Sequence, residues 1–185
     1  MWGQGDMQSD MTRQSGIGPT TRLHICGDRV LLEVANGIAS PGTIALEAGS
    51  LQRILAHLGH VPPTAGELES AIMQIEDDLM PILRSLPNHT QLVTFAPEFW
   101  EVVTAAGLGG SPEVNLDIAT VEMLFNRLAD VAYGVPAARL GIPTTRTFAA
   151  ILLVLREVLH HGGFGSILVM QPLPAPHNSL QGRQP

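Results

Sequence analysis

The stretch RLHICGDRVLLEV, residues 22–34, decides the fold of this chain. Two apolar segments rich in β-branched and aliphatic side chains, 22–26 and 29–35, flank the dipeptide Gly27-Asp28. Glycine and aspartate between two such segments are typical of a tight turn, so the pattern predicts a β-hairpin. The alternative is that CGD derives from a glycine-rich loop that binds phosphate through its backbone amides.

Beyond the hairpin, the chain alternates strand and helix patterns. Thr64 and Glu67 predict a capping box at the start of a long helix, and a kink is expected near Pro81 because proline lacks an amide hydrogen. Hydrophobic periodicity predicts the other elements: strands at 42–49, 91–97 and 166–170, and helices over 50–58, 98–106, 116–132 and from about 143–145 to 160. This order indicates an α/β layer architecture in which the later strands join the sheet in parallel.

Composition limits the classes of function. A length of 185 residues and a hydrophobic content of 45% suit one domain with a real core. The net charge of −7 argues against a nucleic-acid partner, because binding phosphates requires a cationic surface. The longest apolar run, 148–155, is far shorter than the roughly 18 residues of a membrane span, so we expect a soluble protein with no membrane contact. The single Cys26 excludes a disulfide framework and a four-thiolate zinc site, and it suggests a cytoplasmic location.

The chain is expected to have three parts. Residues 1–20 lack periodicity and lack the apolar segment of a secretory signal, so they predict a flexible N-terminal arm. Residues 21–171 form the α/β domain. Residues 172–185 carry four prolines and predict an extended tail.

Two histidine pairs raise the question of a metal site. His57 and His60 are three residues apart, but Gly59 is expected to end the helix between them. His160-His161 has no carboxylate–histidine motif of the metalloprotease type. A structural or surface role is therefore predicted for both pairs. The segment HHGGFG follows a helix instead of preceding one, so it is interpreted as a helix C-cap and not as a phosphate loop.

Other polar groups also have plain structural explanations. Glu76-Asp77-Asp78 lies beside the apolar stripe of its helix and predicts a solvated face. Cys26 and His24 are two positions apart in a strand and point to the same side. That arrangement permits a cysteine nucleophile, or a metal enzyme that adds a remote histidine, and both are weaker hypotheses than a structural role.

The order of elements and several local phrases resemble the second actin-like half of the exopolyphosphatase / guanosine pentaphosphate phosphohydrolase (Ppx/GppA) family. The matching phrases are HICGDRVLLEV (24–34), TIALEAGSL (43–51), PPTAGELESAIMQIEDDLMPIL (62–83), LVTFAPEF (92–99), GIPTTRTFAAILLVLREVL (141–159) and GSILVM (165–170). The resemblance covers residues 22–171. It implies a ribonuclease-H-like (actin-like ATPase) α/β single domain with a mixed sheet of about five strands flanked by helices.

The resemblance also implies where phosphate loops would lie. The first loop falls at His24, Cys26, Gly27, Asp28 and Arg29, where the family has a leading aspartate, a run of glycines and a serine. Only Gly27 of that run remains, and Asp28 places a carboxylate where an anion should bind. The turn interpretation of CGD is therefore preferred.

The second loop and the last helix depart from the family as well. Thr94, Phe95 and Ala96 stand at the second loop, which has no glycine and is followed by Pro97, a residue without an amide donor. The last helix keeps the arginine of the family's Arg-x-Asp phrase as Arg146, but Phe148 replaces the aspartate.

These departures lead to a prediction about function. The resemblance implies an active site between two actin-like halves, of which only one is expected here. We predict a non-catalytic exopolyphosphatase-like domain that acts in binding or assembly, as a homo-oligomer or with a protein partner, with no catalytic residue, metal or cofactor. The alternative is a phosphohydrolase on polyphosphate or a guanosine polyphosphate, completed by a second copy or a partner. Arg29 and Arg146 would then hold phosphate, and Mg²⁺ would neutralise charge.

Overall fold

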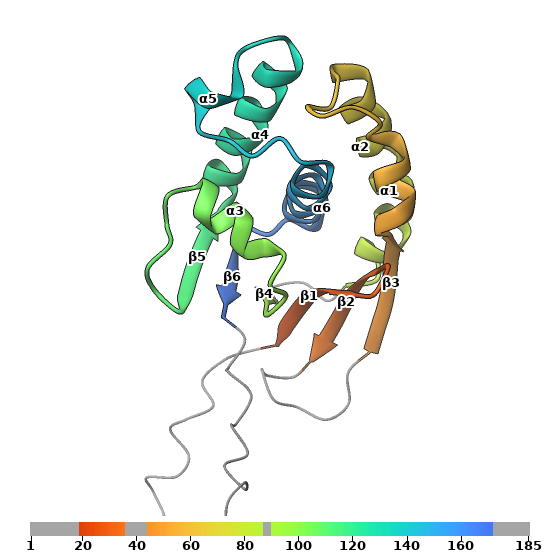
Figure 1. Ribbon diagram of the computed structural model, residues 1–185. Coiled ribbons are helices and arrows are strands. Elements are labelled where there is room, and N and C mark those ends of the chain that lie inside the picture. The colour runs from red at the N-terminus through yellow and green to blue at the C-terminus, as the bar shows by residue number, and fades with distance from the viewer. Residues whose placement is uncertain (1–18, 36–43, 87–89, 172–185) are drawn as a thin grey trace, which may run out of the picture.

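A computed structural model describes residues 19–35, 44–86 and 90–171 of the chain. One six-stranded sheet, in the order β3-β2-β1-β4-β6-β5, supports the helices (Figure 1). The strands are β1 (Thr20–Cys26), β2 (Arg29–Ala35), β3 (Ile44–Ser50), β4 (Gln91–Thr94), β5 (Glu113–Asp117) and β6 (Ser166–Met170). The helices are α1 (Leu51–His57), α2 (Ala65–Leu83), α3 (Phe99–Ala105), α4 (Ile118–Ala132), α5 (Ala137–Leu140) and α6 (Arg146–Gly162). The predicted arm and tail lie outside the described residues, except that Thr20 begins β1.

The predicted hairpin is confirmed. Strands β1 and β2 pair antiparallel along their length, from Thr20 opposite Ala35 to Cys26 opposite Arg29. Gly27 turns the chain with φ of 62°, a left-handed conformation that glycine adopts without steric cost. Strand β3 then pairs antiparallel with β2, so the first part of the chain forms a three-stranded meander.

The later strands join the sheet in parallel, as predicted, with one exception. Strand β4 pairs in parallel with β1, and β6 pairs in parallel with β4. We expected a helix from residue 116, but Glu113–Asp117 forms a strand antiparallel to β6, and its side chains alternate between exposed and buried. The sheet therefore has six strands where about five were predicted. Because β5 has only 5 residues and follows a glycine-rich break, its alternation was too short to separate from the helix that follows.

Helix α6 occupies the middle of the helical layer, between α2 and α4 (Figure 1). Most of its 17 residues are buried, and it contacts α1, α2, α3 and α4. Thr145 caps its start by accepting a hydrogen bond from the Phe148 amide, and Gly163 ends it with φ of 68°. The predicted C-cap is confirmed, although the helix extends two residues past His160 to Gly162. In the described ranges, no helix is both long and apolar enough to cross a membrane.

The capping box of α2 is confirmed and extends to the loop before it. The Glu67 amide donates to Thr64 Oγ1 at 3.3 Å, and the Thr64 amide donates to Glu67 Oε2 at 2.8 Å. The other carboxylate oxygen, Oε1, accepts from the Gly59 amide at 2.9 Å and lies 2.7 Å from Nδ1 of His60. This contact gives His60 a structural role, as predicted. The helix continues through Pro81 to Leu83, and the short α5 was not predicted.

The carboxyl group of Glu67 predicts acid sensitivity. The Thr64 amide, followed by His60, lowers the pKa of Glu67 from 4.5 to about 2. A depressed pKa stabilises the fold above the ordinary value, and that stabilisation is lost as the pH falls from about 4.5 towards 2. We expect E67Q to be less stable than the parent at pH 7 and to lose less stability over this acid range, as measured by thermal unfolding. E69Q, at an exposed position of the same helix, serves as the control and should follow the parent; a parallel decline in parent and E67Q would contradict the prediction.

Candidate functional site

The two loops singled out by sequence lie at one edge of the sheet. Strands β1 and β4 are adjacent and parallel, so the turn after β1 and the segment after β4 both leave the carboxyl edge. In open α/β sheets this edge is where ligands usually bind. The geometry of residues 24–29 and 94–96 therefore decides whether the edge can hold a phosphate.

Asp28 accepts hydrogen bonds from the donors at the start of α1, which face the first loop. Its carboxylate accepts from the Gln52 amide and from the Ser50 hydroxyl, both at 2.6 Å, and its carbonyl accepts from the Leu51 amide at 2.7 Å. Ser50 Oγ in turn accepts from the Arg53 amide. The Ser50 hydroxyl, followed by the Gln52 amide, holds the pKa of Asp28 below its usual value. The amides in the first turn of α1 are thus bonded by the N-cap Ser50 and by the carboxylate of Asp28.

Two other residues of the first loop, Arg29 and His24, lie close to carboxylates of neighbouring strands. Arg29 Nη1 lies 3.6 Å from Glu47 Oε2 on β3, and His24 Nε2 lies 3.1 Å from Glu33 Oε1 on β2. Cys26 is an exposed free thiol. Cross-strand ion pairs of this kind stabilise a hairpin modestly. The polar groups of the first loop therefore have structural contacts within the hairpin and its neighbouring strand.

The second loop folds back on itself. Thr94 is fully buried, and its Oγ1 accepts a hydrogen bond from the Ala96 amide at 3.1 Å. The Ala96 carbonyl accepts from the Phe99 amide, which starts α3. The guanidinium carbon of Arg22 lies over the half-buried Phe95 ring, 5.5 Å from the centroid of that ring. The Ala96 amide, which a phosphate would need, is already used within the loop.

Arg146 lies apart from the first loop. It starts α6, and its Nη1 donates to the Leu58 carbonyl at 3.4 Å, at the end of α1. Asp28 contacts the other end of α1, whose 7 residues span about 10 Å. The structure therefore separates Arg146 from the first loop by the length of this helix. Three surface hollows, of about 530, 480 and 90 Å³, are lined by other residues and by none of these loop positions.

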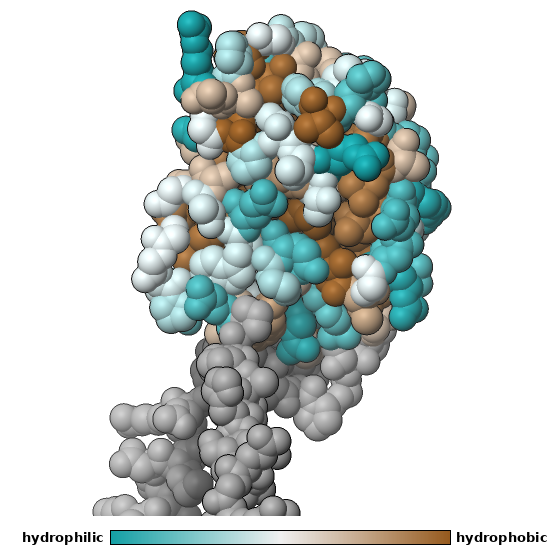
Figure 2. Space-filling model, viewed as in Figure 1, coloured by the Kyte–Doolittle hydropathy of each residue, from teal (hydrophilic) through white to brown (hydrophobic). Residues whose placement is uncertain are grey.

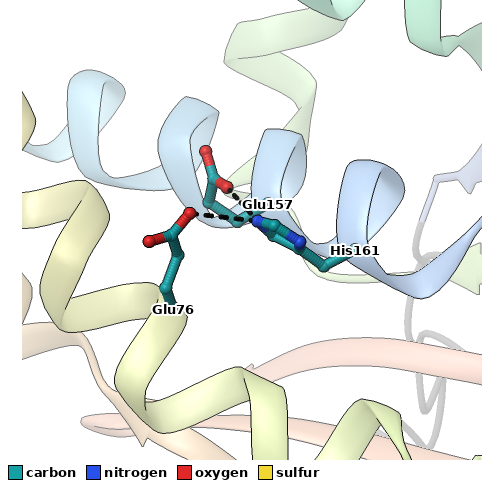
Figure 3. Close-up of side chains that lie close together, drawn as sticks. All are labelled: Glu76, Glu157 and His161. Atoms are coloured by element: carbon teal, nitrogen blue, oxygen red, sulfur yellow. Dashed lines mark hydrogen bonds and ion pairs between the residues drawn. The ribbon is translucent and has the colours of Figure 1, made fainter.

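A different group of chemically active side chains comes together between α2 and α6 (Figure 3). Glu76 on α2 and Glu157 and His161 on α6 form the only set of metal-binding type within the described ranges, so His24 and Cys26 do not combine with a remote histidine there. Nε2 of His161 lies 3.1 Å from Glu76 Oε1 and 3.2 Å from Glu157 Oε2. We call these residues the Glu–Glu–His cluster.

Sequence reasoning missed this cluster although a signal was present. Glu157 and His161 are four residues apart, which places them on one face of a helix. The motif that drew attention was the adjacent pair His160-His161. His160 is exposed, and its ring contacts the ring of His161 edge-on. Glu76 comes from another helix, so no spacing along the chain could have identified it.

The predicted solvated face of α2 is only partly correct. Asp77 is exposed, but both Asp78 carboxylate oxygens accept from Arg53 Nη2 at 3.0 Å. Asp78 also accepts from Gln74 and lies against Gly49, where a side chain would collide with it. Asp78 ties α2 to α1, and Glu76 belongs to the Glu–Glu–His cluster.

Comparison with solved structures identifies the architecture. The chain superposes on the Ppx/GppA enzyme of Aquifex aeolicus with a TM-score of 0.62 at 12% identity, covering 84% of this chain and 54% of that one. It superposes on an exopolyphosphatase of Cytophaga hutchinsonii with a TM-score of 0.60 at 14% identity, covering 85% and 54%. This is the Ppx/GppA fold. No protein-family model matches the sequence, and no curated protein matches it either.

The predicted actin-like fold is therefore confirmed, and the chain spans about half the length of the Ppx/GppA structures that it matches. At these identities the similarity establishes the fold only. Any activity has to be argued from the residues of this chain.

Within this Ppx/GppA fold, the cap of α1 can be tested directly. S50A removes the hydroxyl that accepts from the Arg53 amide and donates to Asp28, so we expect a loss of about 0.5–2 kcal/mol in the free energy of unfolding. Urea unfolding followed by circular dichroism measures this loss. The control is S70A, because the Ser70 hydroxyl donates only to a carbonyl within α2 and should change stability by less than about 0.5 kcal/mol. Equal effects of the two substitutions would show that the cap is unimportant.

Proposed function

We propose that this chain is a non-catalytic exopolyphosphatase-like domain that acts in binding or assembly. The observation that carries the proposal is the contact of Asp28 with the first turn of α1. A phosphate needs free amides there, and the carboxylate already accepts from the Gln52 amide. Its negative charge also repels an incoming anion.

The rest of the carboxyl edge supports the same proposal. The two arginines that would hold phosphate are engaged elsewhere, Arg29 with Glu47 and Arg146 with the Leu58 carbonyl. The second loop offers no glycine, and its Ala96 amide is bonded to Thr94. Catalysis of phosphoryl transfer depends on positioned cations and amides, so an edge without them favours a binding role.

Titration with polyphosphate tests this proposal. We expect no heat of binding in isothermal titration with polyphosphate, with or without Mg²⁺, and no phosphate release from the same sample. The variant D28N keeps the size of the side chain and removes its charge, so it shows whether the carboxylate alone blocks the edge. Binding or phosphate release by the parent chain would overturn the proposal and support the phosphohydrolase alternative, with Mg²⁺ as cofactor.

The helical surface supports a role in assembly. Figure 2 shows hydrophobic residues exposed among hydrophilic ones on the face of the molecule that it presents. Tyr133 is 76% exposed and Met73 59% exposed, and a small hollow of about 90 Å³ between α2 and α4 is lined by Leu68, Ile72 and Phe125, among others. Exposed apolar side chains beside an apolar hollow are typical of a surface that pairs with another protein.

Self-association can be measured by sedimentation velocity. We expect a concentration-dependent shift from monomer to dimer in the micromolar range, and a shift back to monomer in the variant Y133S, because Tyr133 lines the hollow and its apolar contact is lost. The variant L108S changes an exposed apolar residue between α3 and β5 that does not line this hollow and is the control. A strict monomer at high micromolar concentration would exclude self-association through this face.

A further inference from the structure

We propose that the Glu–Glu–His cluster is a binding site for a divalent transition metal ion, with Zn²⁺ the simplest occupant. The site lies between α2 and α6 and is independent of the function proposed above. Its ligands would be Glu76 Oε1, Glu157 Oε2 and His161 Nε2, which all lie within 4.8 Å of one another.

The spacing of the ligand atoms supports a metal. Zinc–nitrogen and zinc–oxygen bonds of 2.0–2.2 Å in a tetrahedral site place neighbouring ligand atoms about 3.3 Å apart. Nε2 of His161 lies 3.1 Å and 3.2 Å from the two carboxylate oxygens, and these oxygens lie within 4.8 Å of each other, so two of the three distances already fit a bound ion. An ion between the carboxylates would also relieve their mutual repulsion, since both are negatively charged.

The surroundings of Glu157 support the same inference. Its side chain is only 1% exposed, so the carboxylate is held in the core instead of in water. Arg156 Nη1 donates to Oε1 of this carboxylate, and Arg156 also pairs with Glu122 and lies over the Phe125 ring. One oxygen of Glu157 is therefore fixed by a neighbouring cation while Oε2 points at His161. Ligating carboxylates in metal sites are commonly oriented by such a second hydrogen bond.

The cluster has access to solvent on one side. A hollow of about 480 Å³ is lined by Glu76 and His161 together with Asp77, Met80, Pro81 and Arg84. A metal held by three protein ligands needs a fourth position, and the hollow leaves room there for water. Asp77 and Arg84 at the rim carry opposite charges, and Arg156 offsets the charge of one of the two ligand carboxylates, that of Glu157.

The ligand types narrow the choice of ion. One imidazole and two carboxylates suit Zn²⁺, Mn²⁺ or Fe²⁺, whereas Mg²⁺ and Ca²⁺ prefer oxygen ligands alone. Without an ion, the same residues form an ion-paired triad in which the imidazole bridges the two carboxylates. The two states differ at Nε2 of His161: in the triad it carries a proton that it donates to the carboxylates, whereas a metal binds only the unprotonated nitrogen.

Isothermal titration of the full chain with Zn²⁺ at pH 7.5, after treatment with a chelator, tests the proposal. We expect one ion bound per chain with micromolar or tighter affinity, and a loss of at least about tenfold in affinity in E76Q and in H161Q. These two positions are partly exposed, so the variants should keep the fold, which circular dichroism verifies. H160Q removes the neighbouring exposed imidazole and is the matched control, with affinity unchanged.

Cobalt provides a second readout that does not depend on affinity alone. A Co²⁺ ion in a four-coordinate site absorbs strongly in the visible range, and we expect this absorption in the parent chain and in H160Q but not in H161Q. Equal Zn²⁺ affinity in parent, E76Q and H161Q would show that other histidines bind the ion, and absence of binding at about 1 mM Zn²⁺ would show that the cluster is an ion pair only. Either result overturns the proposal.

Discussion

The burial of α6 is the constraint on which the rest of the structure depends. A helix with apolar side chains on nearly all sides must be surrounded by protein, because each exposed face would place those side chains in water. Here α1, α2, α3 and α4 all contact it. The sheet order follows from the same requirement, since β4 and β6 pair in parallel and the chain between them must cross over the sheet, which places α6 on its face.

Under the proposed function, the carboxyl edge keeps the fold but not the groups that bind phosphate. Backbone positions there follow from strand pairing, which any hairpin of this length provides. Affinity for phosphate depends on something separate, namely free amides and positive charge. Asp28 accepts hydrogen bonds at the start of α1 and adds a negative charge there. These hydrogen bonds also link the hairpin to the helix. In the proposed function, the contact that opposes anion binding therefore also stabilises the fold.

Much of this fold was predictable because its signals are local. The hairpin, the capping box at Thr64 and the C-cap at Gly163 each depend on residues a few positions apart. Strand β5 was missed because its alternation is short and runs directly into α4, with Asp117 serving both elements. The Glu–Glu–His cluster was missed for a different reason: Glu76 and His161 are 85 positions apart, and only the packing of α2 on α6 joins them.

The Glu–Glu–His cluster lies at the opposite end of α6 from Arg146. Arg146 and His161 belong to the same helix, about 22 Å apart along its axis. His161 lies just before β6, at the amino ends of the parallel strands, whereas the loops after β1 and β4 leave the carboxyl ends. An ion held by the cluster would therefore lie far from Arg146. Its effect would be to hold α2 against the end of α6, because the ion would bind ligands from both helices. It would also offset part of the desolvation cost of the buried Glu157 carboxylate.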